Sequence, residues 1–140
     1  MILFLDTSDF KKLRFALIEE SRGRTERGKA ARAKIKTRSV SVKYNESEKT
    51  LPELQKLIGN NFGKISAIYA VSGPGSFTGI RVGISIALAF SFAKKIPLYA
   101  LKKDKVPKNL SGILKLKNLK NISSNFELDY GAEPNITFPV

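Results

Sequence analysis

A turn rich in glycine and hydroxyl side chains follows an apolar segment at residues 71–81, which read VSGPGSFTGIR. Turns of this kind, placed between a strand and a helix, hold phosphate groups in many nucleotide-binding proteins. Here Ile80 and Arg81 stand where the Walker motif has Lys and Ser/Thr, and Pro74 lacks the backbone N–H that could donate to a phosphate. We therefore predict a structural or partner-facing turn, with an anion at the start of the next helix as the alternative. The residues assigned to this turn are Gly73, Pro74, Gly75 and Gly79.

An acidic turn at residues 6–8, DTS, is the second candidate for chemistry. It follows the apolar run 2–5, and a carboxylate at the end of a first strand can hold a hydrated magnesium ion in phosphotransferases. Asp, Thr and Ser are also the ordinary residues of turns. We predict a turn at Asp6, Thr7 and Ser8, and keep a remnant of a nucleotide or magnesium site as the alternative.

The composition narrows the range of reactions further. The formal charge of +13 in 140 residues favours phosphates, anionic membranes or acidic proteins as partners. The chain has neither His nor Cys, so it lacks the commonest general base and every thiol reaction. We therefore expect no catalytic residue, no metal site, no disulfide and a place in the reducing cytoplasm.

Positive charge is concentrated in residues 22–44, where Glu26 is the single acid. Such a run can contact RNA phosphates, or it can be a solvated loop followed by an edge strand. The run lacks the interleaved aromatics of single-strand binders, so we favour the solvated loop and keep RNA contact as the alternative. The candidate RNA contacts are Arg22, Arg24, Arg27, Lys29 and Arg32.

Short apolar runs bounded by turn residues predict the strands of an α/β fold. Strands are expected at 2–5 and 13–18, joined as an antiparallel hairpin, and the second half of the basic run predicts a charged edge strand. Further strands at 65–73 and 96–101 flank a helix and predict a parallel crossover unit. The sheet is therefore expected to be mixed.

A short amphipathic helix is predicted at 46–58. Two reciprocal caps could begin it, Asn45 with Glu48 or Thr50 with Glu53, and Pro52 suits the first turn of the later start. Gly59 is expected to end this helix.

Residues 78–94 are predicted to form an unusually apolar second helix, because the segment is too long for an ordinary strand and its alanines favour helix. Gly79, Gly83, Ala87 and Ser91 would then lie four apart, as a ridge that another element can approach closely. A helix that is apolar on all sides must pack against other apolar surfaces on two sides, and these come from its own domain or from a partner. The segment is shorter than the roughly twenty residues that cross a bilayer, so we expect no transmembrane segment.

The domain organisation expected from these patterns is a folded lobe at 1–101 and a short basic C-terminal extension at 102–140. Beyond residue 101 the pattern fades, with one strand or short helix expected at 112–119.

Three stretches of the chain together resemble the TsaB family, also called YeaZ, a subunit of the bacterial machinery that installs threonylcarbamoyladenosine in tRNA. They are ILFLDTS at 2–8, NESEKTLPELQKLI at 45–58 and the segment 71–101. The resemblance implies the actin-like and Hsp70-like ATPase fold, an RNase H-like fold, as a single lobe with the second lobe largely missing. The family's usual histidine before SE is Asn45 here, and Ser8 replaces a glycine common in the wider superfamily.

The resemblance also implies a function. Proteins of this family are noncatalytic scaffolds that activate TsaD, the subunit that transfers the threonylcarbamoyl group, while the ATPase TsaE joins the assembly. Two helices, matching 46–58 and 78–94, pair with TsaD in a four-helix bundle, and homodimers form without TsaD. No cofactor is implied for the isolated chain, whereas ATP and magnesium can enter in the complex. The residues expected to bind the partner are Glu46, Thr50, Leu51, Leu54, Ser76, Phe77, Thr78, Arg81, Val82, Gly83, Ile86, Ala87 and Phe90.

Two other functions stay open. One is a basic RNA-binding module that uses residues 22–43 and the lysines between 102 and 120, which is compatible with a scaffold because the assembly acts on tRNA. The other is a phosphotransferase of the same superfamily, which the lack of His, Cys and a second lobe disfavours.

Overall fold

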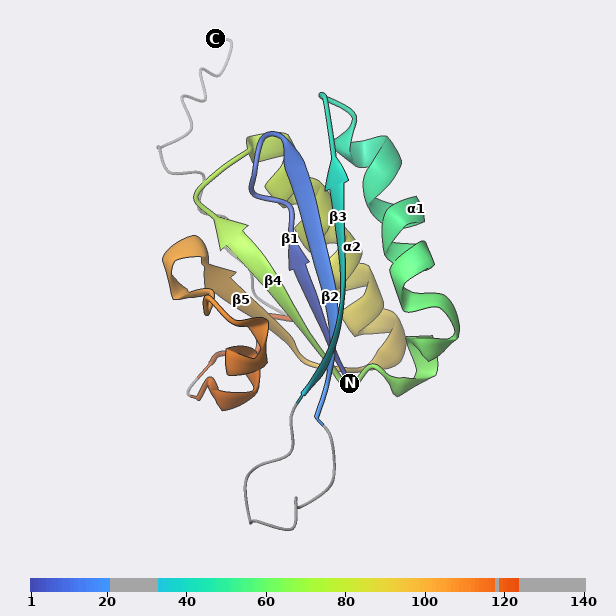
Figure 1. Ribbon diagram of the computed structural model, residues 1–140, viewed down its shortest axis with the longest axis vertical. Coiled ribbons are helices and arrows are strands. Elements are labelled where there is room, and N and C mark those ends of the chain that lie inside the picture. The colour runs from blue at the N-terminus through green and yellow to red at the C-terminus, as the bar shows by residue number, and fades with distance from the viewer. Residues whose placement is uncertain (21–32, 118, 124–140) are drawn as a thin grey trace, which may run out of the picture.

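A mixed five-stranded sheet organises the chain, in the strand order β3-β2-β1-β4-β5 (Figure 1). The computed structural model describes residues 1–20, 33–117 and 119–123. The strands are β1 Ile2–Asp6, β2 Lys12–Glu19, β3 Lys34–Ser41, β4 Ala67–Gly73 and β5 Leu98–Lys102. The helices are α1 Glu46–Ile58 and α2 Phe77–Lys94, and short 3₁₀ helices are formed by Gly59–Lys64, Lys103–Lys105 and Leu110–Lys115.

The strand pairing confirms the expected fold class. β1 and β2 form the antiparallel hairpin, with Asp6 opposite Arg14, and β3 adds to β2 as an antiparallel edge strand. β4 pairs in parallel with both β1 and β5. The segment from β4 through α2 to β5 is therefore the parallel crossover unit that the sequence predicted.

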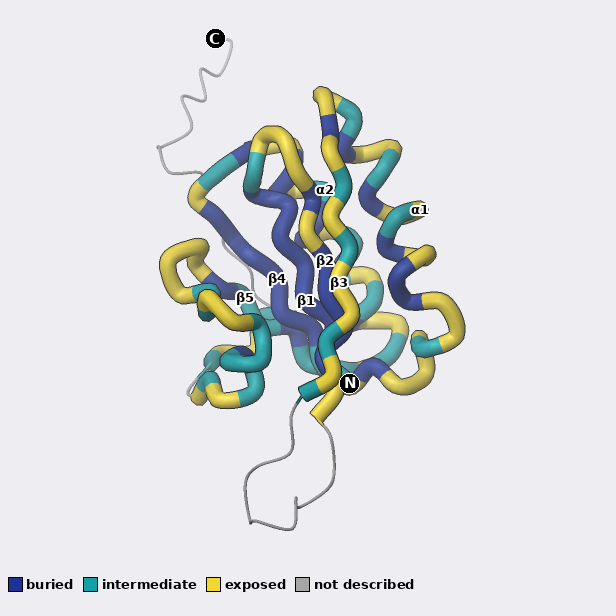
Figure 2. The backbone as a smooth tube through the Cα atoms, in the orientation of Figure 1, coloured by how far each residue is buried: buried dark blue, intermediate teal, exposed yellow. Residues whose placement is uncertain are grey.

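The central strands are buried on both faces, which explains why β1 is continuously apolar. On one face Leu5 belongs to the same buried cluster as Leu54 of α1 and Ile80 of α2. On the other face Phe4 packs in a cluster with Ile113, from the 3₁₀ helix Leu110–Lys115. Residues beyond β5 thus help to cover the second face, and the central strands are dark in Figure 2.

The two edges of the sheet are occupied in different ways. β3 carries exposed Lys34 and Lys36 on its outer edge, and charged side chains of this kind discourage further strand pairing. At β5, the backbone N–H of Leu98 donates to Asn121 Oδ1 at 3.2 Å, and its carbonyl accepts from the N–H of Ile122 at 2.8 Å. A short C-terminal segment therefore occupies part of the outer edge of β5.

α1 begins at Glu46 and ends before Gly59, whose positive φ of 51° suits a glycine stop. The expected side-chain cap is absent, because Asn45 Oδ1 accepts from the backbone N–H of Lys43 at 2.9 Å instead. The later start at Thr50 is wrong: Thr50 lies inside the helix and its Oγ1 donates to the carbonyl of Glu46 at 2.6 Å. Pro52 also lies inside the helix, not in its first turn.

α2 begins at the glycine-rich turn, where Ser76 Oγ accepts from the N–H of Gly79 at 3.1 Å and so caps the helix. By length and composition α2 could cross a membrane, a property that the core helices of soluble proteins share. In this structure α2 packs against β1, β4 and β5. Its apolar character is used in part to cover the sheet.

The ridge of small residues on α2 faces the interior of the chain, and the element that approaches it closely is the turn after β1 and not a partner. A Cβ atom on Gly83 would lie 2.2 Å from Thr7 Oγ1, and one on Gly79 would lie 2.2 Å from the Thr7 carbonyl oxygen. Ala87 and Ser91 are buried along the same row. The missing side chains let α2 lie against the end of β1.

Replacing Gly79 by alanine tests this close approach. We expect Gly79→Ala to lower the free energy of unfolding by about 1–3 kcal/mol, because the backbone at Thr7 must move away from the added methyl group. The measurement is urea unfolding followed by circular dichroism. Gly63→Ala is the matched control, since a Cβ there meets nothing within 4 Å. Equal stability of the two variants would contradict the proposed packing.

An ion pair ties the edge strand β3 to α1. Arg38 Nε and Lys56 Nζ both donate to the carboxylate of Glu53, and these hydrogen bonds lower the pKa of Glu53. A lowered pKa stabilises the fold above the ordinary pKa of a glutamate, and this contribution is lost as the pH falls through the folded-state pKa.

The pKa of Glu53 provides a direct test of this ion pair between β3 and α1. We expect Arg38→Gln to raise this pKa toward the ordinary value of a glutamate, because the hydrogen bond from Arg38 is the largest cause of the lowering. Carboxyl chemical shifts followed by NMR across acid pH measure it. Lys36→Gln removes the same charge from β3 and should leave the pKa of Glu53 nearly unchanged; an equal rise in both variants would show a general charge effect.

Candidate functional site

The two turns that the sequence singled out meet at the carboxyl ends of β1 and β4. The N–H of Ser76 donates to the carbonyl oxygen of Ser8 at 2.8 Å, and a Cβ on Gly75 would lie 2.1 Å from that same oxygen. A carbonyl oxygen is an acceptor, so it offers nothing to a phosphate, which needs donors. Within this chain the glycine-rich turn is packed against the acidic turn instead of standing open as a phosphate cradle.

Asp6 lies beneath this contact and is 1% exposed. Its Oδ1 accepts from the backbone N–H of Ser8 at 3.0 Å and from Ser8 Oγ at 2.6 Å, and its Oδ2 forms an ion pair with Arg14. Thr7 is buried against α2. The residues of the acidic turn therefore do not fit a magnesium ion within this chain, because both carboxylate oxygens are engaged. No cluster of metal-ligating side chains occurs among the residues that the structure describes.

The residues expected to bind a partner divide into an inner and an outer set. Residues of the inner set are buried within this chain and offer a partner little surface: Glu46, Thr50, Leu54, Ser76, Gly83 and Ala87. Those of the outer set are exposed or half-buried: Leu51, Phe77, Thr78, Arg81, Val82, Ile86 and Phe90.

A second row of small residues, which the sequence analysis missed, lies on the outward side of α2. Ser85, Ala89 and Ala93 are exposed and lie four residues apart, on the opposite side of the helix from the buried ridge. Phe92 beside them is 87% exposed. The alternation of large and small residues along the helix placed a small row on both sides, and the sequence could not say which side the sheet would take.

The outer residues of α1 and α2 border a shallow pocket of about 540 Å³. Its walls include Leu51 and Ile58 from α1, Phe62 from the following 3₁₀ helix and Phe90 from α2. The rings of Phe62 and Phe90 meet edge to face with centroids 5.5 Å apart. We call the surface formed by this pocket and the outward row of α2 the helix-pair face.

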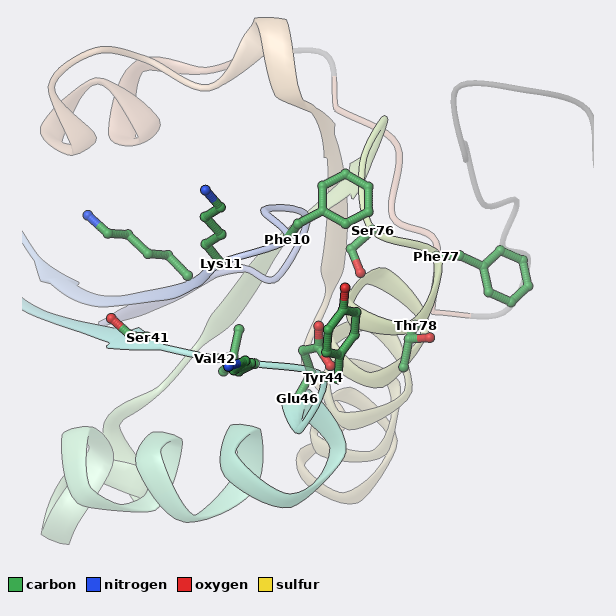
Figure 3. A pocket seen from close by; sticks show the side chains of 11 residues that line it. Phe10, Lys11, Ser41, Val42, Tyr44, Glu46, Ser76, Phe77 and Thr78 are labelled. Atoms are coloured by element: carbon green, nitrogen blue, oxygen red, sulfur yellow. The ribbon is translucent and has the colours of Figure 1, made fainter.

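A larger pocket of about 890 Å³ opens at the other end of the helices (Figure 3). Its lining comes from the loop after β1, from the connection between β3 and α1, and from the start of α2. Phe10, Tyr44 and Phe77 are exposed there beside Lys11, Lys12 and Lys43. Sequence analysis named Phe77 but missed Phe10 and Tyr44, which come together only in the fold.

The basic residues named as candidate RNA contacts, Arg22, Arg24, Arg27, Lys29 and Arg32, lie outside the described residues.

Comparison with known proteins first defines the class of the fold. RuvC of Thermus thermophilus, which has an RNase H-like fold, is similar to this chain with a TM-score of 0.51 and 13% identity, over 86% of this chain and 83% of RuvC. YeaZ from Pseudomonas aeruginosa is more similar, with a TM-score of 0.59 and 25% identity, over 72% of this chain and 43% of YeaZ. The chain is therefore an α/β protein of the RNase H-like class, and one lobe accounts for its sheet.

Sequence comparisons add two partial matches. The family described as "TsaD: tRNA N6-adenosine threonylcarbamoyltransferase" matches residues 44–103. The tRNA threonylcarbamoyladenosine biosynthesis protein TsaB of Buchnera aphidicola is 33% identical over 66 residues, which are 45% of this chain and 31% of that protein. Together with the YeaZ structure, these partial matches show that the chain is similar to TsaB and YeaZ proteins. It spans less than half the length of these TsaB and YeaZ relatives.

Replacing the buried carboxylate tests its structural role. We expect Asp6→Asn to lower the free energy of unfolding by about 1–3 kcal/mol, because the change removes the charge that pairs with Arg14 and leaves buried groups poorly matched. Urea unfolding measures the loss. Asp9→Asn is the matched control on the same loop, where the side chain accepts from the exposed backbone N–H of Lys11, and it should cost less than about 1 kcal/mol. An unchanged stability in Asp6→Asn would contradict a structural role for Asp6.

Proposed function

We propose that this chain takes part in tRNA threonylcarbamoyladenosine biosynthesis as a noncatalytic subunit that binds a TsaD protein through the helix-pair face. The family supports the pathway, since the Buchnera relative is named for it. The carboxylate of Asp6, the acid best placed for catalysis by sequence, is buried and paired. The chain also has no His or Cys with which to supply a general base or a thiol. These features favour a scaffold over an enzyme.

The outward side of α2 is the single observation on which partner binding rests. Ser85, Ala89 and Ala93 leave a shallow path along the helix, and Val82 and Phe92 offer apolar contact beside it. A helix with small residues on its surface allows another helix to approach closely, and apolar flanks supply the area that association buries. The inner ridge at Gly79 and Gly83 is not available for this role.

The partner should itself resemble this chain. The TsaD family model matches residues 44–103, which hold both helices of the helix-pair face. Two proteins with the same helix pair can join by presenting the same surface to each other, as subunits do across a two-fold axis. This supports a pseudo-symmetric pairing with TsaD, and a homodimer through the same face when TsaD is absent.

The wider assembly follows from the same proposal. TsaE would join through TsaD, tRNA would be the substrate of the whole complex, and the complex would work in the cytoplasm. ATP and magnesium would enter at sites that the partners complete, since the acidic turn of this chain does not fit a magnesium ion by itself.

A charge placed on the helix-pair face tests the proposal. We expect Ala89→Arg to weaken the complex with TsaD of the same organism at least about tenfold, because burying an unpaired charge is costly. Size-exclusion chromatography with light scattering gives the stoichiometry, and titration calorimetry gives the affinity. Ser39→Arg, which adds the same side chain to the exposed face of β3, should bind as the unmodified chain does. Gly83→Leu is unsuitable here, because it would disturb the packing of Thr7.

Two results would overturn the partner surface. One is a complex that forms equally well with Ala89→Arg and Ser39→Arg, which would place the contact elsewhere. The other is no complex at all between TsaD and the unmodified chain, together with a chain that stays monomeric at high concentration.

A further inference from the structure

The pocket at the carboxyl ends of β1 and β3 presents three aromatic side chains from three separate segments. Phe10 is 70% exposed, Tyr44 is 95% exposed and Phe77 is 46% exposed. In Figure 3 the rings of Phe10 and Tyr44 lie on the side of the pocket where α2 begins, and Phe77 projects past the start of that helix. Single exposed aromatics are common on proteins, but a gathering of three around one hollow indicates a binding surface.

Tyr44 is held in an unfavourable backbone conformation as well. Its φ of 57° lies in the left-handed region, which non-glycine residues seldom adopt. The neighbouring hydrogen bond from the Lys43 N–H to Asn45 Oδ1 holds this connection in place ahead of α1. A strained backbone that displays a nearly bare aromatic ring gains nothing in packing, and such outliers gather at functional sites.

Lysines line the same pocket as these rings. Lys11 and Lys12 follow Phe10 directly, and Lys43 precedes Tyr44, so each exposed ring of these two loops has a cation beside it in the chain. Among the described lining residues Glu46 is the only carboxylate, and it is 5% exposed. At the start of α2, the Arg81 guanidinium lies 5.0 Å from the centre of the Phe77 ring. The pocket is therefore aromatic and cationic.

We propose that this aromatic–lysine pocket, formed by Phe10, Lys11, Lys12, Lys43, Tyr44 and Phe77, binds single-stranded RNA. Bases stack on the rings of Phe10 and Tyr44, and the lysines lie beside the phosphates. Stacking rings interleaved with cations are the arrangement by which proteins bind single strands without reading their sequence. The choice of RNA over DNA rests on the proposed function in tRNA modification, whereas the stacking and the charge rest on the pocket alone.

The pocket differs in chemistry from the helix-pair face. The helix-pair face has a row of small residues, Ser85, Ala89 and Ala93, which suits another helix. The rings of Phe62 and Phe90 pack against each other at its pocket, and Lys94 lies beside them with its Nζ 4.7 Å from the centre of the Phe62 ring. The pocket combines exposed rings with three lysines, which suits a polyanion that carries flat bases. The same chain can therefore hold RNA at one end of its helices while the helix-pair face meets a protein.

Binding of a fluorescein-labelled ten-nucleotide oligouridylate to the full chain tests the proposal by fluorescence anisotropy. We expect Phe10→Ala and Tyr44→Ala each to weaken binding about fivefold or more, because each removes a stacking surface without changing the charge. Phe92→Ala, which removes an exposed ring of α2 outside the pocket, is the matched control and should bind as the unmodified chain does. The three variants should keep their melting temperatures, since all three side chains are exposed.

Two further measurements test the lysines and the stacking of the bases. Lys43→Gln should lower the slope of log Kd against log salt by about one, because one phosphate contact is lost, whereas Lys36→Gln on β3 should leave the slope nearly unchanged. An abasic oligomer with the same number of phosphates should bind about fivefold or more weakly than the oligouridylate, and this preference should shrink in the double variant Phe10→Ala/Tyr44→Ala.

Several outcomes would overturn the RNA site. Equal binding by Phe10→Ala, Tyr44→Ala and Phe92→Ala would show that the charge of +13 attracts RNA without the pocket. No binding even at low salt would also refute it, and displacement by ATP at concentrations near the RNA Kd would assign the pocket to free nucleotides. Binding to TsaD is measured separately, so a chain that binds RNA but not TsaD refutes the proposed partner surface alone, and the reverse refutes only the RNA site.

Discussion

The close contact between the turn after β1 and the start of α2 is the constraint on which the rest of the fold depends. The carbonyl oxygens of Thr7 and Ser8 lie 2.2 and 2.1 Å from where Cβ atoms on Gly79 and Gly75 would be, so a larger residue at either position would force the turn and the helix apart. That contact fixes the position of α2 over β1 and β4. The rotation of α2 about its own axis follows, and with it which of its residues face solvent.

The same contact also bears on the function of the glycine-rich turn. Glycines are commonly associated with phosphate binding because they let a ligand approach the backbone. Here the atoms that approach belong to the chain itself, in the acidic turn of residues 6–8. The two motifs that most resemble ligand-binding turns thus pack against each other. The surfaces proposed to bind other molecules are the helix-pair face and the aromatic–lysine pocket.

Local patterns were sufficient to predict the hairpin, the crossover unit and both helices, because apolar periodicity and turn residues act over short distances. The orientation of α2 was not predictable in this way. Its sequence puts small residues on two opposite rows, and only the contact with Thr7 decides that the row of Gly83 is buried and the row of Ala89 exposed. Phe10 and Tyr44 escaped notice for a related reason, since residues so far apart in sequence meet only when β1, β2 and β3 have paired.

The occupied outer edge of β5 has a consequence for how copies of this chain can associate. Residues 121 and 122 use the main-chain groups of Leu98, and the lysines of β3 disfavour pairing at the opposite edge. With part of the β5 edge occupied and lysines along β3, the sheet is less easily lengthened by a strand from a second molecule. Copies of the chain must therefore associate through side-chain surfaces of limited area. Such a surface binds no further molecule once it is covered, so small discrete complexes are favoured over fibres.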